Sequence, residues 1–90
     1  MIREAIFKKP FRKDLERIKR TGRDTSRLLD AIALLRMGEP LPLHSRDHQL
    51  VGNYKDYREC HLGGDWLLIY QLTGESVIFI RTGSHTELLD

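Results

Sequence analysis

The spacing of hydrophobic residues predicts one short strand and two helices in the first 38 residues. Residues 2–7 alternate weakly between apolar and polar and predict a strand. Two apolar stripes with helical spacing follow, one of Phe11, Leu15 and Ile18 and one of Leu28, Leu29, Ile32, Ala33 and Leu35. Gly22 and Gly38 stand where each stripe ends, and glycine readily adopts the left-handed conformation that closes a helix. Residues 8–38 are therefore expected to form a helical hairpin.

The second half of the chain predicts strands. Three runs are rich in aromatic and branched residues, namely 57–62, 66–72 and 76–81. The breaks between them are short and contain glycine, which favours antiparallel neighbours because parallel strands need a long crossover. The order β-α-α-β-β-β predicts an α+β domain over residues 1–90, an antiparallel four-stranded sheet with the N-terminal helical hairpin on one face. Residues 39–56 are expected to form a long loop, and such loops are often functional.

Charge is distributed unevenly along the chain. Residues 1–30 hold ten Lys or Arg against five Asp or Glu, whereas residues 31–90 hold five against eight, within a formal net charge of +2. A basic N-terminal third suits contact with RNA or with an acidic protein. A solvated helix face explains the same pattern, so charge alone does not decide between them.

Targeting and redox features are few. No segment has the apolar core of a signal peptide or the roughly 18 apolar residues of a membrane span. Cys60 is the only cysteine, so no internal disulfide is possible. This is compatible with a reducing cytoplasm, where we expect the protein to act. Because Cys60 lies in a strand-forming run, we expect it to be a packed residue and not a nucleophile.

All four histidines lie in the second half, and three of them have neighbours that suggest chemistry. His48 follows an aspartate in the long loop, His61 precedes Asp65 across a glycine turn, and His85 stands just past the last strand. The ends of three consecutive strands would bring these side chains to one surface. We therefore interpret His48, His61, Asp65 and His85 as candidate catalytic residues.

Metal-independent RNA cleavage needs the residue types found in this group. A base removes the proton of the 2′-hydroxyl, an acid protonates the departing 5′-oxygen, and a cation stabilises the phosphorane. Imidazole serves as acid or base near neutral pH, and the planar guanidinium of arginine suits phosphate. Arg81, four residues before His85, is the candidate phosphate ligand.

Other interpretations of these residues remain open. Three histidines and an aspartate also bind zinc, but their spacing matches no compact zinc motif, so we expect neither a metal nor another cofactor. A single histidine is more often structural than catalytic. Trp66 alternates with apolar residues, so it either packs in the core or stacks on a base. Arg58 either contacts phosphate or forms a cross-strand ion pair.

Four blocks stand in order along the sequence: Asp47-His48-Gln49-Leu50-Val51-Gly52, Tyr57-Arg58-Glu59-Cys60-His61, Asp65-Trp66-Leu67-Leu68-Ile69-Tyr70 and Arg81-Thr82-Gly83-Ser84-His85. Together they resemble the YafQ branch of the RelE/ParE toxin superfamily. The resemblance covers essentially the whole chain. It implies a RelE-like fold and a toxin of a type II toxin–antitoxin system that cleaves mRNA in the ribosomal A site.

The resemblance also implies roles and partners. His48, His61, Asp65 and His85 fall on the family's catalytic positions, and Arg81 and Trp66 on its phosphate-binding arginine and neighbouring aromatic. The expected partners are a cognate antitoxin, the ribosome and mRNA, with operator DNA bound only by the toxin–antitoxin complex and no membrane contact. The chain departs from the family in having Leu89 where an aromatic is usual, and leucine cannot stack on a base in the same way.

Two other functions remain as alternatives. One is a non-catalytic, ParE-like toxin that acts on DNA gyrase, which would have no need for histidines at the strand ends. The other is a degenerate toxin retained as a DNA-binding co-repressor, which the basic hairpin permits.

Overall fold

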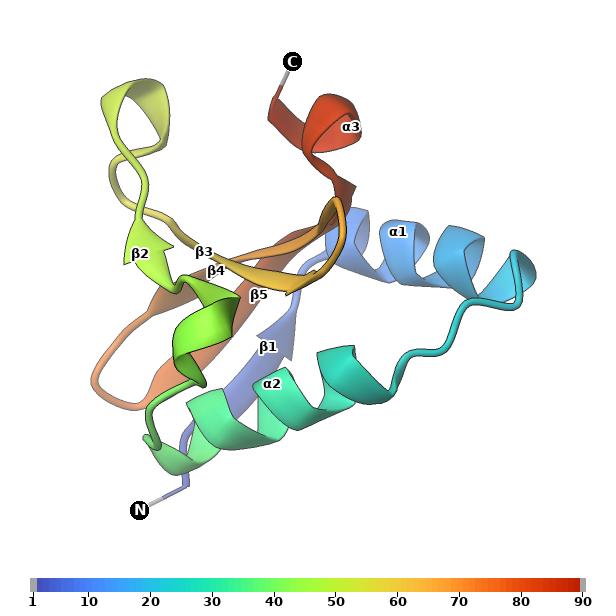
Figure 1. Cartoon of the computed structure of the whole chain (residues 1–90). Helices are drawn as coiled ribbons and strands as arrows, with labels where there is room; N and C mark the ends of the chain where they lie inside the picture. The colour runs from blue at the N-terminus through green and yellow to red at the C-terminus, as the bar shows by residue number, and fades with distance from the viewer. Residues whose placement is uncertain (1, 90) are drawn as a thin grey trace.

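The structure is a computed structural model that describes residues 2–89 and has the predicted α+β architecture (Figure 1). Its main elements are β1 (Glu4–Phe7), α1 (Lys9–Arg20), α2 (Ser26–Met37), β3 (Arg58–Gly63), β4 (Trp66–Leu72), β5 (Ser76–Ser84) and α3 (His85–Leu89). The long loop between α2 and β3 carries the 3₁₀ turn η1 (Leu43–Ser45), the two-residue strand β2 (His48–Gln49) and the 3₁₀ turn η2 (Gly52–Tyr54).

The strands form one five-stranded mixed sheet in the order β1-β5-β4-β3-β2. The prediction of four antiparallel strands was wrong in two respects. β1 pairs in parallel with β5, with Phe7 opposite Phe79, and the loop contributes β2 as a further, antiparallel edge strand. Short glycine turns set the direction of sequential neighbours only. The chain between β1 and β5 contains the whole hairpin and two strands, so it is long enough for a parallel crossover.

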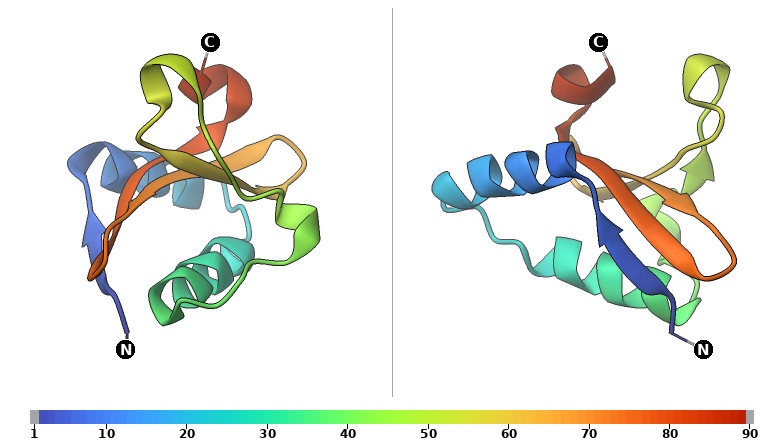
Figure 2. Two further views of the ribbon diagram at one scale, coloured as in Figure 1. Left: turned by 90° about the vertical axis from the view of Figure 1, so that its left-hand side faces the viewer. Right: turned by 180° about the vertical axis from the view of Figure 1, so that it is seen from behind.

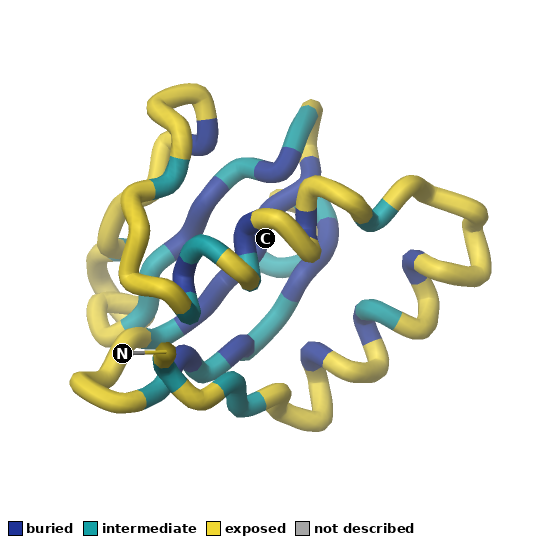
Figure 3. The backbone as a smooth tube through the Cα atoms, turned by 90° about the horizontal axis from the view of Figure 1, so that it is seen from below, coloured by how far each residue is buried: buried dark blue, intermediate teal, exposed yellow. Residues whose placement is uncertain are grey.

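Both helices of the hairpin cover one face of the sheet and bury one stripe each (Figures 2 and 3). The buried cluster on this face comprises Phe11, Ile18, Leu28, Ala31, Leu35, Cys60, Leu62, Trp66, Leu68, Tyr70, Val77 and Phe79. The stripe predicted for α1 is confirmed. In α2, however, Leu29 is 59% exposed and Ala31 is buried instead. The pairing of β4 with β5 has a β-bulge, where the register shifts between Ile69 and Tyr70. A bulge of this kind bends the strand and increases its local twist.

The opposite face of the sheet carries α3 and the loop segment with η2, which rise from it on the same side (Figure 1). α1 and α2 cover one face of the sheet, and α3 and the η2 segment lie over the other. Gly83 faces α3, because a Cβ there would lie 3.2 Å from Glu87 Oε1. Its partner Leu67 and the partner of Leu67, His61, share that face, and so does Glu59, two residues before His61. No helix within residues 2–89 has the length and apolar character needed to cross a bilayer.

Candidate active site

Two of the predicted histidines meet at a glutamate that the sequence analysis did not single out. β2 pairs with β3 so that His48 lies opposite Glu59. His48 Nε2 is 3.2 Å from Glu59 Oε1, and His61 Nε2 is 3.7 Å from the same oxygen. The two imidazole rings are stacked with centroids 6.4 Å apart. The two-residue strand in the long loop thus positions His48 beside His61.

Glu59 is a buried carboxylate with incomplete hydrogen bonding. Its side chain is 7% exposed, and its Oε2 has no hydrogen-bond partner among the described residues. A buried charged oxygen without a partner costs free energy, and such groups are more typical of functional sites than of cores. The available sequence signal was a carboxylate two residues before His61, which alternation along a strand places on the same face as that histidine.

The proton on His48 is constrained by its surroundings. Nδ1 is 2.6 Å from the backbone carbonyl of Arg46, and a carbonyl can only accept, so Nδ1 carries a hydrogen. Nε2 therefore faces Glu59, with 3.2 Å between Nε2 and Oε1. His48 thus bridges the backbone carbonyl of Arg46 and the carboxylate that His61 also approaches.

His61 has a different environment. Burial lowers the pKa of His61 below its usual value of 6.5, and the positive charge of Arg46 lowers it further, while Glu59 acts in the opposite direction. Arg46 Nη2 is 3.4 Å from His61 Nδ1, so the guanidinium faces one nitrogen and Glu59 the other. His85 is near enough for its charge to lower the same pKa. His61 is therefore neutral at pH 7 and able to accept a proton.

His85 begins α3 and is exposed, at the same side of the sheet as the other histidines. Its backbone N–H donates to the backbone carbonyl of Asp65 at 3.2 Å and lies 3.4 Å from Asp65 Oδ1. Asp65 thus holds the backbone of His85 and not an imidazole ring. The structure brings His48, His61 and His85 to one face, with Asp65 at its edge.

The two candidate arginines are both held by carboxylates of this chain. Arg81 donates to Asp14 through Nε at 2.6 Å and Nη2 at 3.1 Å, and this pairing raises the pKa of Arg81. Arg58 Nη2 is 3.3 Å from Asp47 Oδ2, and Arg58 Nε donates to the Tyr70 hydroxyl. Arg58 therefore makes an ion pair, with a loop aspartate, and its contact with phosphate stays a prediction. Arg81 is 37% exposed at its side chain, so a phosphate can still approach it.

Trp66, for which core packing and base stacking were both considered, lies in the core of this structure. Its side chain belongs to the buried cluster and the residue is only 3% exposed. Nε1 donates to Thr82 Oγ1 at 2.8 Å, and the guanidinium of Arg23 covers the ring at 4.5 Å. These contacts are those of a core-packed ring, and a role for Trp66 in RNA binding stays a prediction. Cys60 is likewise buried, and burial raises the pKa of its thiol to about 12.

Metal ligands are not grouped within the described part of the chain. No three His, Cys, Asp or Glu side chains among residues 2–89 are arranged to hold a metal ion. The arrangement that is present, imidazoles around one carboxylate, is suited to moving protons.

Comparison with known proteins gives a consistent result. The family described as "Bacterial toxin of type II toxin-antitoxin system, YafQ" matches residues 3–90. The mRNA interferase toxin YafQ of Escherichia coli K12 is 36% identical over 87 residues, which is 96% of this chain and 95% of that protein. The crystal structure of the E. coli DinJ–YafQ toxin–antitoxin complex matches at a TM-score of 0.91, with 34% identity and 100% of both chains covered. A metal-bound toxin from Helicobacter pylori matches at a TM-score of 0.89, with 37% identity, 99% of this chain and 100% of the other.

Proposed function

This chain belongs to the YafQ family of bacterial toxins of type II toxin–antitoxin systems, and on that premise we propose that it is a ribosome-dependent, metal-independent mRNA endonuclease. The observation that carries the proposal is the cluster of His48 and His61 around Glu59, with His85 on the same face. Imidazole and carboxylate groups suffice for cleavage by the 2′-hydroxyl, which leaves a 2′,3′-cyclic phosphate.

The proposed roles follow from the contacts. Either His48 or His61 takes the proton of the 2′-hydroxyl, since both contact Glu59 and His61 is neutral at pH 7. His85, exposed at the start of α3, protonates the departing 5′-oxygen. Arg81 stabilises the negative charge on the phosphorane. Each well-placed acid or base contributes about 10²–10⁴-fold to the rate.

The proposed partners are a cognate antitoxin, the ribosome and mRNA, in the cytoplasm. The existence of a DinJ–YafQ complex for the E. coli relative supports the antitoxin. Among residues 2–89, Trp66 is buried and only Phe7 and Tyr54 are exposed aromatics, at 39% and 43%, so the chain has few aromatic rings with which to grip RNA unaided. We therefore propose that the ribosome positions the mRNA, and that operator DNA is bound only by the toxin–antitoxin complex.

The test is to map the ends of an mRNA translated in a purified system with this protein, with and without a chelator. We expect cuts inside codons and 2′,3′-cyclic phosphate ends that persist in chelator, and no cuts with His85→Gln. Cuts that stop in chelator would contradict metal independence. Intact mRNA accompanied by gyrase-dependent DNA damage would instead support the ParE-like alternative.

A further inference from the structure

His85 is carried by a helix that has little stability of its own. α3 spans only residues 85–89, and none of these is buried. Helices this short are not stable in isolation, because forming the first turn is costly and few hydrogen bonds follow. Something outside the helix must therefore hold its first turn, where His85 lies, in place.

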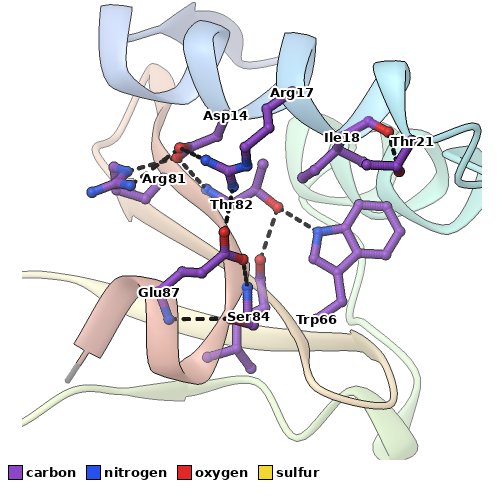
Figure 4. Close-up of polar contacts among 10 residues, drawn as sticks. Asp14, Arg17, Ile18, Thr21, Trp66, Arg81, Thr82, Ser84 and Glu87 are labelled. Carbon is purple, nitrogen blue, oxygen red and sulfur yellow. Dashed lines mark hydrogen bonds and ion pairs between the residues drawn. The ribbon is translucent and has the colours of Figure 1, made fainter.

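A reciprocal pair of hydrogen bonds closes this first turn (Figure 4). Glu87 Oε1 accepts from the backbone N–H of Ser84 at 2.9 Å, and Ser84 Oγ accepts from the backbone N–H of Glu87 at 3.1 Å. This is a capping box, which satisfies two backbone donors at the start of the helix. The hydrogen bonds from Ser84 lower the pKa of Glu87, so its carboxyl is ionised at neutral pH.

The same carboxylate is attached to α1. Arg17 Nη2 is 3.2 Å from Glu87 Oε2, and Arg17 Nη1 is 3.3 Å from Asp14 Oδ1. Asp14 in turn accepts a hydrogen bond from Arg81, the candidate phosphate ligand. A continuous series of ion pairs therefore links Arg81 to Glu87 in the α3 cap (Figure 4). Gly83 allows this approach, since a Cβ there would lie 3.2 Å from both Arg17 Nη2 and Glu87 Oε1.

We propose that Glu87 is a positioning residue for the cleavage reaction, closing the capping box with Ser84 and, with Arg17, fixing the first turn of α3 so that the His85 imidazole faces the scissile phosphate. This inference rests on the proposed function. Neither Glu87 nor Arg17 touches the reacting atoms in this scheme.

The cap and the ion pair are expected to contribute unequally. Arg17 and Glu87 are 45% and 46% exposed at their side chains, and ion pairs of such exposure contribute little. Capping hydrogen bonds contribute more to helix formation. α3 has no buried residue to compensate, so a weakened cap should appear directly as a smaller fraction of molecules with His85 in place.

The test compares Glu87→Ala with Glu87→Gln, in the full chain acting on translating ribosomes. Glutamine keeps a carbonyl oxygen for the Ser84 N–H but loses the charge, whereas alanine loses both. We expect Glu87→Ala to lower kcat about fivefold to tenfold with KM unchanged within about twofold. Glu87→Gln and Arg17→Met should each cost about twofold. Glu75→Ala, an exposed glutamate in the β4–β5 turn, is the matched control and should cleave as the unmodified chain does.

Amide hydrogen exchange at residues 86–89 gives a readout that does not need activity. Glu87→Ala should exchange faster there while the melting temperature and the exchange of β3–β5 stay unchanged. Equal kcat for Glu87→Ala and the unmodified chain, or slowed cleavage without faster exchange in α3, would overturn the proposal. If Glu87→Ala fails to fold, Ser84→Ala, which removes the other half of the box, decides by the same two measurements. An unmodified chain that leaves mRNA intact would contradict the proposed function instead.

Discussion

The two faces of β3 show how one strand serves stability on one side and chemistry on the other. Cys60 and Leu62 are buried under the helical hairpin among apolar side chains. Glu59 and His61, their immediate neighbours, point to the other face, where imidazoles and Arg46 surround them. Alternation along a strand places consecutive residues on opposite faces, so a single register determines both environments.

The difference between the faces lies in how completely polar groups are satisfied. On the helical face the buried polar groups have partners: Thr82 Oγ1 accepts from Trp66 and donates to the backbone carbonyl of Leu67. On the other face Glu59 keeps an oxygen without a partner among the described residues. The first arrangement favours a unique fold. The second costs stability and keeps a carboxylate available to react.

The largest effect should come from the helical face. Phe79→Ala removes a fully buried ring that stacks on Phe7 at 5.1 Å and lies 5.7 Å from Phe11. The lost burial and the cavity should lower the free energy of unfolding by about 3–5 kcal/mol. Denaturant titration measures this loss. Leu72 is 39% exposed, so Leu72→Ala is the control and should lose much less stability. If the folded fraction of Phe79→Ala cleaves at the normal rate, stability depends on the helical face and cleavage on the other. Lost cleavage in the folded variant would show that cleavage also depends on the helical face.

The reverse pattern is expected for Glu59→Gln. The substitution keeps the shape but removes the carboxylate that both His48 and His61 contact, so we expect cleavage to fall about 10²-fold. Removing a buried, incompletely paired charge should leave stability unchanged or raise it by about 1 kcal/mol. Cleavage assays and denaturant titration on the same preparation test both parts. A large loss of stability with cleavage retained would assign Glu59 to the structure alone.

The helical face was largely predictable from the sequence because it depends on periodicity. The stripe of Phe11, Leu15 and Ile18 and the three glycine-separated strands follow from spacing alone, and the structure confirms them. The parallel pairing of β1 with β5 did not follow, since turn chemistry says nothing about strands distant in sequence. The exposure of Leu29 could not be predicted from the spacing either, because α2 is oriented about its axis so that Ala31 faces the sheet instead.

The reactive face was predictable in its residue types but not in its contacts. His48, His61 and His85 were found as chemically unusual residues, and the structure brings them to one face. Their meeting point, Glu59, was missed because β2 had not been recognised as the strand that places His48 opposite it. Asp14 was missed as the partner of Arg81 because 67 residues separate them.

A smaller effect should appear in the titration of His61. Its pKa is lowered in the folded chain, so the unfolded chain binds this proton more readily. The stability contributed by neutral His61 is complete above pH 6.5 and is lost as the pH falls through the lower folded value. Arg46→Gln removes one cause and should raise the pKa, whereas Glu59→Gln should lower it. NMR titration of the ring protons tests this order, and an inverted order would exclude the charges of Arg46 and Glu59 as causes.

The smallest effect should come from substituting Cys60, which lies on the helical face directly after Glu59 on the other face. Cys60→Ala removes one buried sulfur, so we expect a loss of about 1 kcal/mol in stability and normal cleavage. Because burial raises the pKa of the thiol to about 12, the unmodified chain should resist alkylation at pH 8 until it unfolds. Fast alkylation of the native chain would mean that β3 opens locally. Local opening of β3 would expose the neighbouring Glu59 as well. The different environments of the two faces would then not depend on a fixed strand register.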